Sequence, residues 1–155
     1  MLPCPADWPR LSSALYYDDP AAAIRFLEEA FGFVTRIRVE GPDGAIEHSE
    51  LCFGEALVMV AGTRARPGQE PRGASPKSLG GRNTQSLFLY VDDADAHCAR
   101  ARAAGATIRV EPATSDYGPE YWSDRGYEAA DPEGHRWWFA HRIRSAPQVS
   151  ASPEG

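Results

Sequence analysis

Two polar side chains in the segment 45–53, AIEHSELCF, could carry acid–base chemistry. The alternation of apolar and polar residues predicts a strand, and His48 and Glu50 lie two residues apart on it, so both should point to one face. An imidazole beside a carboxylate could act as base and acid, could anchor a polar ligand, or could supply two ligands to a divalent metal. A pair on an edge strand that faces water is the alternative interpretation.

A second segment, residues 131–141, reads DPEGHRWWFAH and carries Trp137 and Trp138 side by side. The Gly and Pro predict a turn, and the residues after it predict a strand. Such a strand would fit either the last strand of a metal site or one wall of an aromatic pocket that needs no metal.

The composition argues against several classes of protein. The chain has 155 residues and a net charge of −6, which disfavours nucleic acid and anionic membranes as partners. No apolar run is long enough for a membrane span, and the start of the chain lacks the basic and apolar pattern of a secretory signal. Cys4, Cys52 and Cys98 are scattered, which argues against a disulfide framework or a structural zinc site. We therefore expect a cytoplasmic protein.

The chain contains two similar segments, one on each side of a linker rich in Gly, Pro and Arg, residues 62–84. Before it stands LYYDDPAAAIRFLEEAFGFVTRIRVE, and after it stands FLYVDDADAHCARARAAGATIRVE. Each text predicts an apolar strand, an Asp that caps an Ala-rich helix, a Gly that ends the helix, and a second strand. Each half then continues with two further strands, at about 45–53 and 56–61 and at about 121–130 and 135–141.

The order βαβββ therefore occurs in both 11–61 and 85–142, between an N-terminal arm at 1–10 and a tail at 143–155 that we expect to be disordered. Neither half could bury its sheet alone. We predict an α+β fold of two βαβββ modules whose mixed sheets curve around a cleft. The loop 115–121 would be either a lid on that cleft or a plain connection, and His97 would lie on the polar side of an exposed helix.

This duplicated pattern, opened by YYDDPAAAIRFLEEAFGF and LYVDDADAHCARARAAGA and closed by DPEGHRWWF, resembles the vicinal oxygen chelate superfamily over about residues 11–142. That superfamily includes glyoxalase I, bleomycin resistance proteins, fosfomycin resistance enzymes and extradiol dioxygenases. The resemblance implies a scaffold that serves many chemistries, commonly as a homodimer.

The metal-dependent members carry His, Gln or Glu ligands on the first and last strands of each module. By this resemblance the corresponding positions here are Ser12, Met59, Ser86 and Trp138. An indole offers only an N–H donor, and the other three side chains are poor ligands for first-row cations. We therefore expect no metal and no other cofactor.

Strand alternation predicts which side chains share the open face with those positions, while Leu15, Tyr17, Trp137 and Phe139 pack on the helices. The predicted ligand-binding residues are Tyr16, His48, Glu50, Met59, Phe88, Tyr90, Arg125, Tyr127 and Trp138. Such an aromatic face would suit a small organic ligand, either flat or cationic, or it could simply fill the interior.

Two functions of different classes follow. The first is a metal-free small-molecule-binding protein of the bleomycin resistance type that sequesters a drug. The alternative is an enzyme: a metal-dependent lyase, isomerase or dioxygenase with displaced ligands such as His48 and Glu50, or a metal-free acid–base catalyst that uses the same pair. A partner-binding module would be favoured if the cleft were filled by its own side chains.

Overall fold

The computed structural model describes residues 5–6, 8–65 and 68–147. Its elements follow the predicted order and are β1 (Ser13–Tyr17), α1 (Pro20–Phe26), η1 (Leu27–Phe31), β2 (Val34–Glu40), β3 (Ile46–Phe53), β4 (Ala56–Gly62), η2 (Pro76–Leu79), β5 (Leu87–Tyr90), α2 (Ala94–Ala103), β6 (Thr107–Asp116), β7 (Ser123–Ala130) and β8 (Arg136–Arg144). The second module therefore extends to Arg144, two residues past its predicted end, and most of the predicted tail lies outside the described residues.

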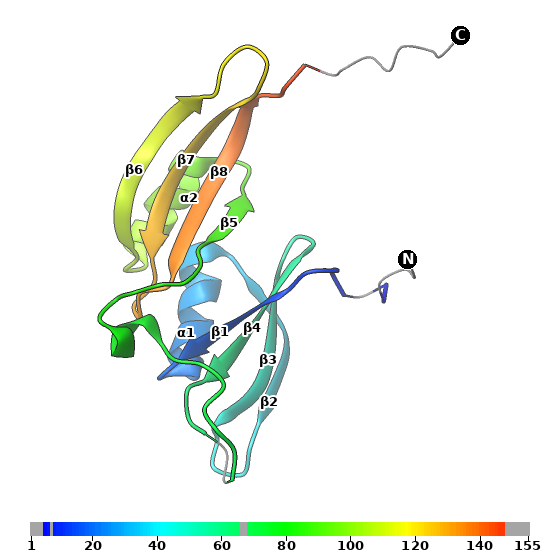
Figure 1. The fold of residues 1–155 in the computed structure, drawn as a ribbon, viewed down its shortest axis with the longest axis vertical. Helices are drawn as coiled ribbons and strands as arrows, with labels where there is room; N and C mark the ends of the chain where they lie inside the picture. The colour runs from blue at the N-terminus through cyan, green and yellow to red at the C-terminus, as the bar shows by residue number, and fades with distance from the viewer. Residues whose placement is uncertain (1–4, 7, 66–67, 148–155) are drawn as a thin grey trace.

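The two sheets repeat one topology, which confirms the predicted α+β fold of paired βαβββ modules. Their strand orders are β1-β4-β3-β2 and β5-β8-β7-β6, and in each the first strand runs parallel to its neighbour while the other pairs are antiparallel. Figure 1 shows the sheets one beyond the other along the long axis of the molecule, each with its helix behind it. The predicted cleft between the two sheets is not confirmed.

The first helix begins and ends as the sequence indicates. The Asp19 carboxylate accepts a hydrogen bond from the Ala22 N–H at 2.9 Å, and Pro20 occupies the first turn, where its missing N–H costs nothing. α1 continues into the π-helical turn η1, which Gly32 ends at φ 81°. Asp93 caps α2 in the same way.

A single hydrophobic core joins the two modules on the helix side of both sheets. Phe31, at the end of η1, packs on Phe139 at 4.8 Å and on Trp137 at 5.4 Å between ring centroids, although both partners belong to β8 of the other module. The residues predicted to pack on the helices, Leu15, Tyr17, Trp137 and Phe139, are all buried. Neither module thus completes its core alone.

His97 of α2 lies within this shared core and not on an exposed helix face, so that expectation is wrong. Its Nε2 lies 3.0 Å from the Phe31 carbonyl oxygen and its Nδ1 lies 2.6 Å from the Tyr127 hydroxyl. Burial lowers the pKa of His97, outweighing the Phe31 carbonyl, which raises it. The neutral ring therefore links η1 of the first module to β7 of the second.

The turn after β7 adds a buried polar link between the modules. The Asp131 carboxylate accepts hydrogen bonds from the Tyr17 hydroxyl at 2.7 Å and from the Trp137 indole N–H at 3.1 Å. Burial, followed by the Asp131 charge, raises the pKa of Tyr17 well above its usual value. The phenol thus stays protonated and can donate to Asp131.

The register of β7 contradicts one predicted placement. Tyr127 lies opposite Phe139, and Glu128 lies opposite Trp138. Residues opposite each other in an antiparallel pair point to the same face, so Tyr127 points with Phe139 into the core, where it is fully buried. The prediction that Tyr127 shares the open face with Trp138 is wrong. The turn 131–135 sets a register in which Glu128, and not Tyr127, lies opposite Trp138. A one-residue change of register reverses every side chain.

The prediction that Arg125 lies on the open face is wrong for the same reason. It lies opposite His141, and its Nε atom is 2.5 Å from the Asp95 carboxylate at the start of α2. His141 also faces the helix, where its Nδ1 accepts a hydrogen bond from the Ala94 N–H at 3.0 Å. Arg125 therefore holds the helix on the sheet and does not line the open face.

The loop 115–121 connects β6 and β7 at the end of the second sheet that is far from the first module (Figure 1). Arg144 holds it through the Asp116 carboxylate at 2.5 Å and the carbonyl oxygens of Gly118 and Tyr121 at 3.1 Å and 3.0 Å. Of the two alternatives for this loop, the position favours a connection.

Candidate small-molecule pocket

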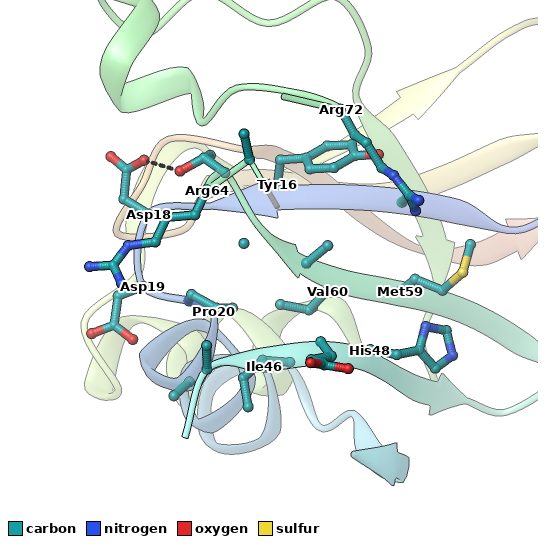
Figure 2. Close-up of a pocket in the computed structure, with 18 of the residues that line it drawn as sticks. Tyr16, Asp18, Asp19, Pro20, Ile46, His48, Met59, Val60, Arg64 and Arg72 are labelled. Carbon is teal, nitrogen blue, oxygen red and sulfur yellow. Dashed lines mark hydrogen bonds between the residues drawn. The ribbon is translucent and has the colours of Figure 1, made fainter. Parts of the chain in front are cut away.

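A pocket of about 580 Å³ lies on the open face of the first sheet (Figure 2). Side chains of β1, β3 and β4 line it, the start of α1 and the β2–β3 turn close two of its edges, and the linker after β4 crosses it. The lining residues include Ala14, Tyr16, Asp18, Asp19, Asp43, Glu47, His48, Met59, Ala61, Arg64, Glu70 and Arg72. The volume is in the range of pockets that hold a drug-sized molecule.

The pocket opens where β3 and β4 separate. The two strands pair regularly where Leu51, Cys52 and Phe53 face Val58, Leu57 and Ala56. Nearer the pocket the Ser49 hydroxyl takes over, donating to the Val60 carbonyl at 2.7 Å and accepting from the Val60 N–H at 3.2 Å. The side chain thus satisfies both backbone groups of Val60 where the strands separate.

Three side chains form a polar cluster at the β3 edge of the pocket. His48 Nε2 lies 2.9 Å from Glu50 Oε1, while Arg36 of β2 contacts the other carboxylate oxygen at 2.8 Å through Nε and at 2.6 Å through its terminal nitrogen. Glu50 is only 5% exposed, whereas the His48 side chain is 43% exposed. Glu50 therefore lies beneath His48, which is the member that lines the cavity.

The cluster also keeps Glu50 ionised. Burial alone would raise the pKa of Glu50, but the hydrogen bonds from His48 and Arg36 outweigh burial and lower it. An ionised carboxylate only accepts hydrogen bonds, so Nε2 of His48 carries a proton. When Nε2 carries the only ring proton, Nδ1 is an acceptor.

The part of the linker that crosses the pocket is held at both ends. Thr63 donates to the Asp18 carboxylate at 2.8 Å, and Ser75 donates to Glu133 at 2.5 Å. Between them Gly73 lies so close to Tyr16 that a Cβ there would be 2.3 Å from the ring. Glycine is thus the residue that lets the linker lie flat on this tyrosine.

Glu133 couples the pocket to the second module. Besides Ser75, its carboxylate accepts the backbone N–H groups of Asp18 and Asp19 at 2.7 Å and 2.9 Å. The negative charge also lies beside the start of α1, where it is favourable. The DPEG turn of the second module therefore holds both the linker and the β1–α1 corner of the pocket.

The structure divides the predicted site residues into three groups. Tyr16, His48 and Met59 line one pocket, as Figure 2 shows, with Glu50 beneath His48. Phe88, Tyr90 and Trp138 lie together on the open face of the second sheet. Arg125 and Tyr127 face the helix.

Sequence reasoning missed the residues that the linker and turns bring to the pocket, since these carry no periodicity. The linker composition was the sole signal, and it was interpreted as a connection.

The aromatic face of the second sheet, formed by Phe88, Tyr90 and Trp138, is largely open. Phe88 and Tyr90 are 53% and 49% exposed, and their rings meet edge to face at 5.2 Å. Gly126 lies below Trp138, where a Cβ would be 3.1 Å from the indole nitrogen. Arg142 lies over the Tyr90 ring at 5.1 Å. This surface is a candidate contact for a ligand or another chain.

The four positions that the metal-dependent relatives would use do not fit a metal here. The Ser12 hydroxyl is buried with no partner among the described residues, and Trp138 lies over Gly126. In the described part of the chain, no three His, Cys, Asp or Glu side chains are grouped in a way that could hold a metal ion. The donor set therefore does not suit a divalent cation.

A model of the Glyoxalase/Bleomycin resistance protein/Dioxygenase superfamily matches residues 11–139. The chain belongs to this superfamily. It is 38% identical over 136 residues to an uncharacterised protein of Mycobacterium bovis, covering 88% of this chain and 85% of the relative. An uncharacterised protein of Mycobacterium tuberculosis strain H37Rv shows the same identity, covering 88% of this chain and 76% of the relative.

Solved structures share the superfamily fold. TioX from Micromonospora sp. ML1 is 29% identical with a TM-score of 0.67, over 87% of this chain and 99% of TioX. TnmS3, an antibiotic binding protein from Streptomyces sp. CB03234, is 20% identical with a TM-score of 0.58, over 84% of this chain and 93% of TnmS3. Within the described residues, no helix has the length and apolar character needed to cross a bilayer.

Proposed function

We propose that this protein binds a small organic molecule, as a sequestering member of its superfamily that needs no divalent metal. The observation that carries the proposal is the pocket of about 580 Å³ on the first sheet, with Tyr16 and Met59 as apolar contacts and His48 as a polar one. A concave surface that combines apolar contacts with polar side chains able to orient the ligand is what such a ligand requires. Antibiotic binding in the related fold of TnmS3 supports the same class of function.

The charges around the pocket favour a neutral or cationic ligand over an anionic one. Its lining contains five carboxylates and two arginines, so the carboxylates are in excess. Tyr16 adds an aromatic surface for stacking or for a cation, on the order of 1 kcal/mol. The overall charge of −6 argues against nucleic acid as a partner. The scattered cysteines fit a reducing cytoplasm, which is the location that we propose.

A homodimer is part of the proposal. The rings of Phe88 and Tyr90 are about half exposed beside Trp138, and such an aromatic surface is typical of interface centres. Sedimentation velocity over a range of concentrations tests this. Tyr90→Lys should shift a dimer to monomer, whereas a wild-type chain that sediments as a monomer throughout would contradict it.

The binding test uses 9-aminoacridine, a flat fluorescent cation, followed by fluorescence anisotropy. Ala61→Leu fills the pocket and should weaken binding at least about ten-fold, because the added methyls occupy ligand volume. Phe88→Ala is the matched control on the second sheet and should leave affinity unchanged. Binding that is lost with Phe88→Ala and kept with Ala61→Leu would place the ligand on the wrong surface for this proposal.

A second candidate function is acid–base catalysis, favoured by the 2.9 Å contact of His48 with an ionised Glu50. Elemental analysis of protein purified without chelators separates the mechanisms, with the double variant His48→Ala, Glu50→Ala as control. About one metal per chain that disappears in the control would overturn the metal-free proposal. For a metal-free catalyst, Glu50→Gln should abolish turnover and spare ligand binding.

A further inference from the structure

We propose that the pocket selects ligands that carry a hydroxyl group on an aromatic ring, and that Nδ1 of His48 accepts a hydrogen bond from this hydroxyl. This inference rests on the proposed binding function and names the chemical class of its ligand. It depends on which nitrogen of His48 the Glu50 contact leaves for a ligand, and on which other acceptors line the pocket.

The acceptor is fixed by the cluster beneath it. Nε2 of His48 is engaged with Glu50 Oε1 at 2.9 Å, and Arg36 occupies the other oxygen of the same carboxylate. Glu50 therefore cannot rotate away from His48 without breaking its pair with Arg36. Within the part of the chain that the structure describes, Nδ1 of His48 has no hydrogen-bond partner. When one ring nitrogen of a histidine donates to a carboxylate, that contact fixes the tautomer and leaves the other nitrogen as an acceptor for a ligand.

The space beside His48 suits a flat ring. Ala61 stands opposite Tyr16 on β4 and contributes one methyl group, so the sheet surface between the tyrosine and β3 is low. Met59 forms one wall, and its unbranched side chain adapts to the edge of an aromatic ring. Figure 2 shows Tyr16 and His48 on different sides of this cavity, with Met59 near His48. A ring that lies over Ala61 can therefore contact Tyr16 while its hydroxyl reaches His48.

The alternative acceptors are the carboxylates at the cavity edge. Asp43 already accepts from the Ala45 N–H at 3.2 Å, and Glu47 has a contact of its own. Asp43 lies in the β2–β3 turn and Glu47 near the start of β3, and both lie on the cavity lining. Asp18 and Asp19 likewise already accept, from the Thr63 hydroxyl and the Ala22 N–H, and Glu70 belongs to the linker. His48 is thus the acceptor that the strands themselves offer beside Met59 and Ala61.

The test compares 2-naphthol with 2-methoxynaphthalene, which has the same ring system and an oxygen at the same ring position but no O–H donor. Dissociation constants are measured by fluorescence titration at mildly alkaline pH. The wild-type protein should bind 2-naphthol about five-fold more tightly than the methyl ether, the effect of one net hydrogen bond. In His48→Phe this ratio should fall to about one. Met59→Leu is the matched control, which should change both affinities alike and keep the ratio.

The imidazole nitrogen resonances of the wild-type protein give a readout that needs no variant, since the Nδ1 signal of His48 should move with 2-naphthol and stay with the ether. Equal binding of both compounds by the wild type would overturn the role of His48 and leave the binding function standing. If the folded variant His48→Phe kept the affinity ratio of 2-naphthol to 2-methoxynaphthalene, another group would accept the hydroxyl, and the role of His48 would also be overturned. Binding of neither this pair nor 9-aminoacridine would overturn both proposals.

Discussion

Replacing His97 with Leu tests the link between the modules. The change removes the donor to the Phe31 carbonyl and the acceptor for the Tyr127 hydroxyl, which lie 3.0 Å and 2.6 Å from the ring. Tyr127 is fully buried, so its hydroxyl loses a partner that water cannot replace. An unsatisfied buried group costs about 1–3 kcal/mol, and the lost ring contact with Phe139 adds to this. We expect the free energy of unfolding to fall by about 2–4 kcal/mol in urea titrations.

A double-mutant cycle isolates the hydrogen bond. Tyr127→Phe should destabilise the wild type by about 1 kcal/mol, because it leaves His97 without its donor. In the His97→Leu background the same change should be neutral or stabilising, since it then removes an unsatisfied hydroxyl. If the destabilisations by His97→Leu and Tyr127→Phe add to that of the double variant within about 0.5 kcal/mol, the hydrogen bond and the bridging role of His97 would be refuted.

The same contact predicts a pH dependence. Burial lowers the pKa of His97 below its usual 6.5, so the unfolded chain binds the proton first as the pH falls. Stability should therefore be full above about 6.5 and decline below it until the lowered folded pKa is reached, with a slope of at most about 1.4 kcal/mol per pH unit from this group. His97→Leu should remove that part of the slope, and an unchanged slope in the variant would show that other groups cause it.

Three further changes give separate outcomes. Glu50→Gln removes the carboxylate that Arg36 contacts and should lower the free energy of unfolding, measured in urea, by about 2–4 kcal/mol. Because the pKa of Glu50 is lowered from 4.5 in the folded protein, the wild type should lose stability as the pH falls below about 4.5, and the variant should lose less. Gly126→Ala would place a Cβ 2.8 Å from a backbone oxygen and 3.1 Å from the Trp138 indole, so we expect a loss of about 1–3 kcal/mol and a shifted tryptophan emission, both absent if the strand relaxes freely. Tyr17→Phe removes one of the bonds to Asp131 and should lower the melting temperature by several degrees, a cost of about 1–2 kcal/mol in differential scanning calorimetry; no change would mean that this bond adds nothing to the link.

The local rules of the sequence predicted the elements well where one signal governed one element. Asp19 and Pro20 marked the start of α1, Gly32 marked the end of the helical segment, and the second half of the chain repeated the pattern. The placement of His48 and Glu50 on one face was also correct, because both lie on a single strand whose alternation no partner strand can change.

Side chains on different strands were placed less well. Arg125 and Tyr127 were assigned to the open face, although the alternation within β7 was itself correct. Which alternate set faces the core depends on register, and the turn 131–135 sets that register. The helical pattern likewise could not show that another module would cover the His97 face of α2.

The sequence by itself determined that this chain folds as two βαβββ modules, because periodicity and caps are properties of short segments. Its resemblance to the superfamily implied that Ser12, Met59, Ser86 and Trp138 stand where metal-dependent members carry their ligands. The tertiary structure alone decided where a ligand could bind. The pocket exists because β3 and β4 separate at Ser49, the linker crosses Tyr16 at Gly73, and Glu133 holds that linker from the other module. These contacts join residues far apart in the chain, and their pairing depends on packing, which no local pattern specifies.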